Sequence, residues 1–286
     1  MATQIEIRSN LAERVIASLK AGAPPWRSPH NRGIPTNPVT GRKYTGINPL
    51  VLDAVADKCG YRSKFWATYH QWDTIGLKVP KRPTNISPGN WGINIVNWQP
   101  FIKTVDKGEI LSMERFHLLQ PITVFNADQC FGKDMGKYLI LEETITSPDY
   151  SKAEKIVEST KAKIIHHARV KKPRYDRMPK DRIMMPLRKH FRDDAQYWAA
   201  VFHELAHYSE LRIGWNKEEA HGELMAEIVT GYMESELNLP HDSDMTNHEK
   251  WVKIWIEEIE KNPIYLFEAA AHAARSLDWI LGTKEN

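Results

Sequence analysis

Apolar residues at helical spacing predict helices at both ends of the chain. In residues 10–20, apolar side chains recur every four positions, which predicts a short amphipathic helix. A second helix is expected over 48–60, with Asn48 as its cap and a proline in its first turn. Near the C-terminus, apolar stripes predict helices over 251–259 and 263–282, which we interpret as core elements.

Between these helical parts the pattern favours short strands. Residues 77–79, 91–98 and 115–125 combine β-branched and aromatic side chains, and they predict a small antiparallel sheet. Residues 173–186 predict a further strand pair about a turn at Pro179, and Ile183 to Pro186 are its candidate edge strand. The chain is therefore expected to be α+β.

Residues 195–212 predict a helix that carries the most informative motif, His-Glu-Leu-Ala-His at 203–207. His203 and His207 are four residues apart, so both lie on one helix face and can hold one zinc ion. Glu204 is then placed beside the metal as a general base. The alternative is a purely structural role, in which the His and Glu residues make only surface or interhelix contacts.

A second predicted helix, capped by Asn216 with Glu219 as capping partner, carries Glu223 and Glu227 on one face. A catalytic zinc site needs three protein ligands and one open position, so Glu223 would complete the set. Glu227 would then support a ligand histidine through its second nitrogen. The spacing alone leaves the reverse assignment of these two acids open. Zinc fits these ligands, and manganese or cobalt can occupy the same set.

Composition limits the class of protein. The 286 residues allow two domains, and ten tryptophans and 42% apolar residues favour packed cores. Cys59 and Cys130 lack metal-type spacing and are expected to be reduced thiols, as in the cytoplasm. The polar N-terminus is unlike a signal peptide. No apolar stretch is long enough to span a membrane, so no membrane partner is expected.

Charge divides the chain into two parts. Residues 1–125 carry 16 Lys and Arg against 8 Asp and Glu, whereas the remainder is net acidic. Cations interleaved with aromatic rings suit single-stranded nucleic acid, because cations neutralise phosphates and flat rings stack on bases. An ordinary solvated face with core tryptophans is the competing interpretation. The candidate DNA-binding residues are Trp26, Arg27, Arg42, Lys43, Tyr44, Arg62, Lys64 and Trp66, with Lys81 and Arg82 as weaker candidates in a proline-rich turn.

Several segments together resemble ArdC-type antirestriction proteins. They are residues 25–27 (Pro-Trp-Arg), 40–48, 124–126, the 203–207 motif and the stretch from Glu223 to Glu227. The resemblance implies an N-terminal single-stranded DNA-binding domain over 1–127, a linker over 128–149 and a zincin-like metallopeptidase domain over 150–286. It also implies Glu223 as the third ligand and Glu227 as its support.

The function implied by the resemblance is protection of incoming single-stranded plasmid DNA from host restriction during conjugation. The peptidase-like site would act on a protein or peptide bound to DNA or part of the restriction machinery. Two alternatives remain: a cytoplasmic zinc peptidase that cleaves DNA-associated proteins, and a DNA-coating shield whose zinc site is vestigial. A metallonuclease is disfavoured because a His, His, Glu set lacks the clustered oxygen ligands that magnesium prefers.

Overall fold

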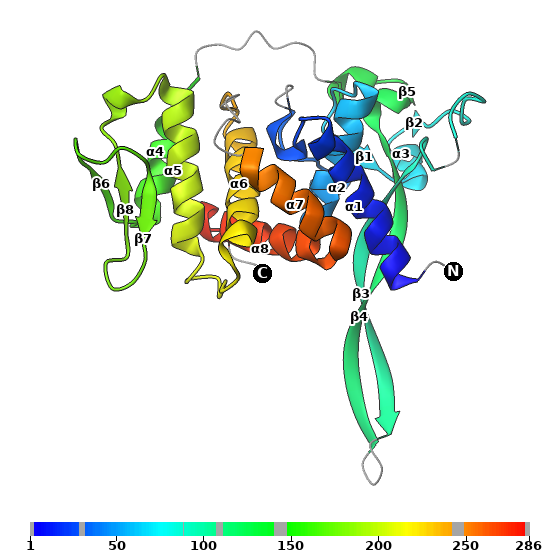
Figure 1. Cartoon of the computed structure of the whole chain (residues 1–286). Coiled ribbons are helices and arrows are strands. Elements are labelled where there is room, and N and C mark those ends of the chain that lie inside the picture. Colours follow the sequence, from blue (N-terminus) through cyan, green and yellow to red (C-terminus); the bar gives the residue numbers. More distant parts are fainter. Residues whose placement is uncertain are drawn as a thin grey trace.

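A central group of helices is flanked by small sheets, and one long hairpin projects from the molecule (Figure 1). The computed structural model describes residues 3–28, 32–87, 89–106, 111–139, 148–241 and 249–283. The predicted α+β class is confirmed. None of the described helices is long and apolar enough to cross a membrane.

The N-terminal helices begin where local capping is strongest. Helix α1 (Gln4–Lys20) starts earlier than predicted, because the Thr3 and Glu6 side chains form a capping box. Helix α2 (Ile47–Cys59) ends at Gly60 as predicted, but its N-cap is Gly46. The Asn48 side chain instead donates to and accepts from the backbone of Val96 in a neighbouring strand, which joins the helix to the sheet.

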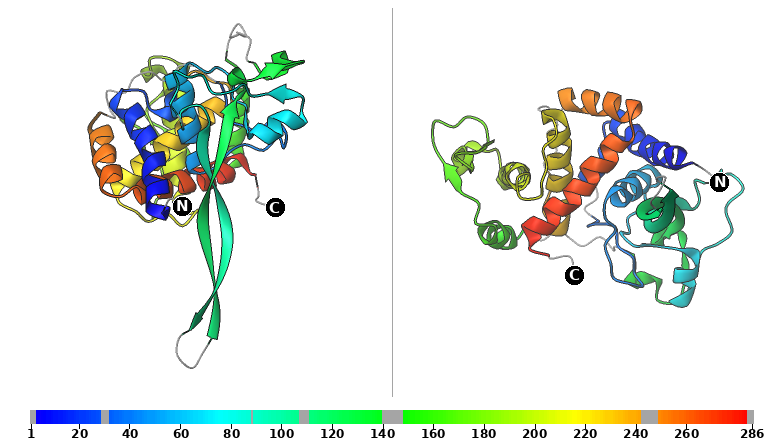
Figure 2. Two further views of the ribbon diagram at one scale, coloured as in Figure 1. Left: turned by 90° about the vertical axis from the view of Figure 1, so that its right-hand side faces the viewer. Right: turned by 90° about the horizontal axis from the view of Figure 1, so that it is seen from below.

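The projecting hairpin consists of β3 (Ile93–Asp106) and β4 (Leu111–Asn126), which pair antiparallel along their whole length. Figure 2 shows the two strands twisting about each other as they leave the body of the molecule. Both strands are longer than predicted. The short strand β1 (Trp66–Ala67) adds to the base of β4, and α3 (Tyr69–Thr74) follows it. A separate pair is formed by β2 (Leu77–Lys78) and β5 (Phe131–Gly132).

The predicted linker contains short elements of regular structure. It contains the single-turn helices η2 (Ala127–Gln129) and η3 (Met135–Lys137), while residues 140–147 lie outside the described residues. Helix α4 (Ser151–Ser159) follows.

A second sheet comes next, formed by β6 (Ile164–His166), β7 (Arg174–Asp176) and β8 (Arg182–Met185). The predicted strand pair is confirmed, since β7 and β8 are antiparallel. The prediction that Ile183 to Pro186 form an edge strand is wrong. The strand order is β6-β8-β7, so β8 pairs on both sides and β7 is an edge.

The short helix η4 (Arg188–His190) leads into four long helices, α5 (Asp194–Ser209), α6 (Glu219–Glu236), α7 (Glu249–Lys261) and α8 (Ile264–Leu281). The Asp193 side chain caps α5 by accepting from the backbone N–H of Gln196. The N-cap of α6 is Glu218, two residues after the predicted cap at Asn216. Helices α5, α6 and α8 pack on one another.

The two parts of the chain share one hydrophobic core. Helix α1 packs against α7, α2 against α8, and the single-turn helix η1 (Pro25–Arg27) against α6. The Trp26 backbone lies so close to α6 that a Cβ on Gly231 would be 1.9 Å from the Trp26 carbonyl oxygen. The predicted domain boundaries stay a prediction.

Candidate metal centre

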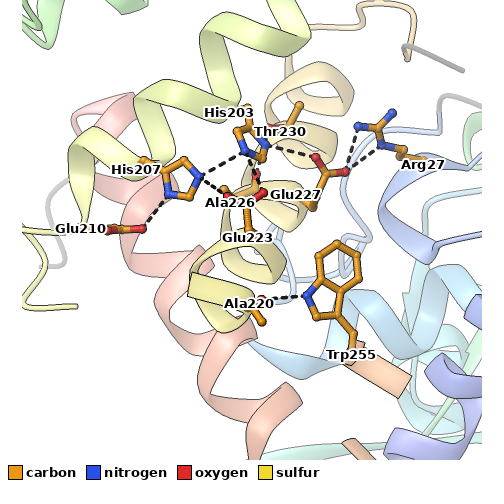
Figure 3. A network of polar contacts seen from close by, with 10 residues as sticks. All are labelled: Arg27, His203, His207, Glu210, Ala220, Glu223, Ala226, Glu227, Thr230 and Trp255. Atoms are coloured by element: carbon orange, nitrogen blue, oxygen red, sulfur yellow. Dashed lines mark hydrogen bonds and ion pairs between the residues drawn. The ribbon is translucent and has the colours of Figure 1, made fainter. Parts of the chain in front are cut away.

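Helices α5 and α6 bring three candidate ligands to one point (Figure 3). The Nε2 atoms of His203 and His207 are 3.2 Å apart. The Glu223 carboxylate from α6 lies 3.6 Å from His203 Nε2 and 3.3 Å from His207 Nε2. One donor atom from each residue falls within a 4.8 Å group. Two imidazoles and one carboxylate that converge in this way fit a divalent metal of the zinc class.

Each histidine is held from behind by a buried acid. His203 Nδ1 lies 3.1 Å from Glu227 Oε1, and His207 Nδ1 lies 2.7 Å from Glu210 Oε1. A carboxylate at Nδ1 fixes the ring orientation and leaves Nε2 free to bind a metal. This geometry places Glu227 behind His203 and Glu223 between the two Nε2 atoms.

Both buried acids are in turn held by arginines. Arg27 donates from Nε and Nη2 to Glu227 Oε2 at 3.2 and 2.9 Å (Figure 3). Arg177 donates to Glu210 Oε2 at 2.5 Å. The sequence interpretation missed Glu210, Arg27 and Arg177 in these roles. Only Glu210 carried a local signal, because it is three residues after His207 and so shares its helix face.

Glu204 has the burial expected of a general base. Its side chain belongs to the buried polar residues, and burial raises the pKa of its carboxyl, while the charges of His203 and His207 oppose this effect. For Glu223, burial by itself would raise the pKa, but hydrogen bonds from His203 and His207 hold it well below the usual range. The two acids therefore differ in basicity, and Glu204 is the better proton acceptor of the pair.

The metal-site residues open into a large cleft of about 1320 Å³. Its lining includes most of residues 168–177, which contain the edge strand β7, together with the start of α6 and Trp251 of α7. His203, Glu204, His207 and Glu223 all line this cleft, so a substrate placed there would meet the candidate ligands and Glu204 together.

Three of the predicted DNA-binding residues are corrected by their positions. Trp26 and Trp66 are each 1% exposed, so neither ring offers a face to a base. Trp26 packs edge-to-face on Trp255, and Trp66 does so on Tyr61. Arg27 is committed to Glu227 in an almost fully buried ion pair. Trp26 and Arg27 therefore belong to the contacts that hold the two parts of the chain together, whereas Trp66 packs within the N-terminal part.

The remaining candidates lie on or near the surface. Arg42 and Arg62 are exposed, Lys64 is half-buried, and Lys43 pairs with Glu236 at 2.6 Å. The Tyr44 hydroxyl donates to a backbone oxygen at 2.8 Å, and burial raises its pKa to about 12. DNA contact by these five residues stays a prediction.

Two family models match separate parts of the chain. Residues 5–126 match the N-terminal domain of anti-restriction factor ArdC, and residues 151–272 match a zincin-like metallopeptidase. The second match contains every residue of the candidate metal centre except Arg27. The fold and site thus define a protein that carries a zincin-like metallopeptidase domain behind an ArdC N-terminal domain.

Solved structures agree with this organisation. The metal-free crystal structure of the antirestriction ArdC protein from plasmid R388 is 26% identical, with a TM-score of 0.78, and the similarity covers 98% of this chain and 100% of that one. The Mn(II)-bound structure of that protein is 27% identical, with a TM-score of 0.74, over 96% and 97% of the two chains. The chain belongs to the ArdC-type antirestriction proteins.

Curated relatives extend the comparison. Two Escherichia coli proteins named DNA primase TraC are each 29% identical over 96% of this chain, but the chain spans only 20% and 27% of their length. The uncharacterized protein y4eC of Sinorhizobium fredii (strain NBRC 101917 / NGR234) is 26% identical over 97% of this chain and 92% of its own length.

Proposed function

We propose that this chain is an antirestriction protein that binds single-stranded DNA through its N-terminal part and carries a metal-dependent peptidase site. The site is supported above all by the convergence of His203, His207 and Glu223 beside the buried Glu204. The DNA part is supported by the ArdC N-terminal match and by the excess of cations in residues 1–125. The relatives named as DNA primases are consistent with a nucleic-acid context.

The residues present suit hydrolysis of an amide bond. A divalent metal held by His203, His207 and Glu223 supplies Lewis acidity, which polarises a carbonyl and makes water more acidic. Glu204 accepts the proton of the attacking water and returns it to the departing amine. Glu227 and Glu210 keep the imidazoles oriented throughout. Zinc is the proposed metal, and the Mn(II)-bound ArdC structure supports manganese as an alternative.

The proposed biological role is protection of incoming plasmid DNA from host restriction during conjugation, in the cytoplasm. A protein or peptide associated with that DNA is the proposed substrate of the metal site. The competing proposal is a DNA-coating shield whose metal site performs no hydrolysis.

One variant separates these proposals. We expect Glu204→Gln to keep its metal and its DNA binding but to lose hydrolysis, because the amide cannot accept a proton. Conjugation of an unmodified plasmid into a restricting host then reports protection. Loss of protection in Glu204→Gln supports the peptidase, whereas full protection supports the shield. Cleavage of a protein substrate at the wild-type rate by Glu204→Gln would refute the role of Glu204.

A further inference from the structure

The small sheet beside the metal cleft carries a concentrated positive charge. Residues 161–192, which contain β6, β7 and β8, hold 12 Lys and Arg against 2 Asp and Glu, a net charge of +10. Residues 193–286, which form the helices behind the cleft, hold 7 against 19, a net charge of −12. The positive charge is therefore a property of this sheet and its loops, and the rest of the metallopeptidase part has the opposite sign.

More than half of these cations have no acidic partner among the residues that the structure describes. The five that form ion pairs are Arg174 and Arg182 with Asp176, Arg177 with Glu210, Arg188 with Asp194, and Arg192 with Asp193. The other seven are exposed, and none of them forms an ion pair with any residue that the structure describes. Seven unpaired cations in 32 residues repel one another, so a polyanion that covers them is stabilised.

Strand topology gathers the unpaired cations at the two ends of the sheet. Strands β6 and β8 are parallel, so the loop after β6 and the segment after β8 leave the same end. That end of the sheet carries four of the unpaired cations, Arg169, Lys171, Lys172 and Lys189. Two of them, Lys171 and Lys172, also line the metal cleft. The opposite end carries Lys161 and Lys163 before β6 and Lys180 in the β7–β8 turn.

We propose that this sheet is a second nucleic-acid surface, which binds the phosphates of a single DNA strand and leads that strand along the metal cleft. The strands are three or four residues long, so the two basic ends are roughly 10 Å apart at about 3.3 Å per residue. Regularly spaced phosphates match charge at both ends of the sheet. A peptide in the cleft would meet Lys171 and Lys172, whereas Lys161, Lys163 and Lys180 do not line the cleft.

This surface lies in the metallopeptidase part, outside the match to the ArdC N-terminal domain. The proposal rests on the proposed DNA binding and extends it to the metallopeptidase part. It also explains how proteins bound to DNA would be brought to the metal site. A strand held beside Lys171 and Lys172 would bring a protein on that strand to the cleft that Glu204 lines.

The test uses full-length protein and a fluorescent single-stranded oligonucleotide longer than the roughly 4–16 nucleotides that one single-strand-binding fold covers. Affinity is measured over a salt series for wild type and for Lys171→Glu/Lys172→Glu. The control is Lys253→Glu/Lys261→Glu on α7, two exposed lysines whose replacement changes the net charge equally. We expect the sheet variant to bind at least about tenfold more weakly and its salt slope to shrink by about 1.4, which is about 0.7 for each phosphate that is no longer neutralised. The control should match wild type.

Four results would overturn the proposal. Equal reductions of affinity in the sheet variant and the control would mean that only net charge matters. Wild-type DNA affinity in the sheet variant, with weaker binding by Arg42→Glu/Lys43→Glu, would confine the DNA to the N-terminal part and leave the proposed function intact. Unchanged DNA affinity, together with a failure to cleave acidic peptides, would assign the basic wall to a peptide. Absence of DNA binding by wild type would remove this surface and the proposed DNA function together.

Discussion

Arg27 Nη2 lies 2.9 Å from Glu227 Oε2, although 200 residues separate the two in the sequence. The side chains are only 8% and 1% exposed, so the ion pair is shielded from water. Glu227 uses its other oxygen to hold His203. A residue of the ArdC N-terminal domain thus orients, through one carboxylate, a candidate ligand in the metallopeptidase domain. We therefore expect metal binding and the docking of residues 25–27 to be thermodynamically linked through this contact.

Replacement of Arg27 should therefore weaken metal binding. We expect Arg27→Lys to lower metal affinity by up to about tenfold, the lower end of the cost of losing a direct partner of a ligand histidine, because Arg27 acts through Glu227. Lysine keeps the charge but cannot form the two-point contact with Glu227. Competition with a chelator of known affinity measures the effect, and Arg42→Lys on the surface is the matched control. Equal affinities for Arg27→Lys and wild type would show that Glu227 holds His203 without help from Arg27.

Removal of the Arg27 charge should also affect folding. Arg27→Ala leaves Glu227 buried without this partner, and breaking a buried pair in this way costs about 3–5 kcal/mol. Urea unfolding of the metal-free protein measures the difference. Replacement of the exposed Arg42 by alanine should change the free energy of unfolding by less than about 0.5 kcal/mol. A similarly small change for Arg27→Ala would contradict the importance of the pair.

Glu210 is expected to matter for the second ligand histidine. Its side chain is fully buried and holds His207 Nδ1 at 2.7 Å, so Glu210→Gln removes the charge that orients and polarises this ring. Metal affinity should fall about 10–100-fold. Glu236→Gln, which alters only a surface pair with Lys43, is the matched control. If both variants bind metal as wild type does, Glu210 has no part in the metal centre.

Gly231 permits the close approach of η1 to α6. A Cβ there would lie 1.9 Å from the Trp26 carbonyl oxygen, so Gly231→Ala must push the two elements apart. Overpacking of this kind costs about 1–3 kcal/mol, and metal affinity should fall with it because Arg27 moves with Trp26. Gly136→Ala, with no atom within 4 Å of the added carbon, is the control for both measurements. Normal metal affinity in a destabilised Gly231→Ala protein would separate domain docking from the metal centre.

Asp53 should make stability depend on pH. It is buried beside the Tyr232 hydroxyl at 3.5 Å, and burial raises its pKa to about 8, although Arg32 opposes the shift. The folded protein therefore keeps this proton to higher pH than the unfolded chain does. Its contribution to stability is complete below about pH 4 and is lost as the pH rises through about 8. Asp53→Asn should flatten this decline in urea unfolding between pH 5 and 8. Parallel profiles for the two proteins would contradict the raised pKa.

The sequence indicates those features of the candidate site that depend on local geometry alone. The four-residue spacing of His203 and His207, and of Glu223 and Glu227, depends only on helix geometry, which the apolar pattern of α5 and α6 reveals. The ends of α2 at Gly60 and of α8 at Gly282 are equally predictable, because glycine readily adopts the left-handed conformation of a C-cap.

Features that depend on contacts between distant segments could not be predicted. Nothing near Arg27 in the sequence indicates Glu227, so its charge suggested DNA instead. Trp26 and Trp66 carry no local sign of burial, since a tryptophan beside cations suits either a base or a core. The edge prediction for Ile183 to Pro186 is wrong because the distant strand β6 completes the sheet on the other side of β8. Backbone pairing and side-chain packing across the chain decided each of these cases.

The metal content of purified ligand variants tests the central claim most directly. Elemental analysis of wild-type protein should find about one divalent metal ion per chain, as one three-ligand site requires. His203→Ala, His207→Ala and Glu223→Gln should each lose that ion, whereas Glu227→Gln should bind it more weakly but at the same stoichiometry. Full metal content in Glu223→Gln, with none in Glu227→Gln, would reverse the two acids. Full metal content in His203→Ala would contradict the metal centre altogether.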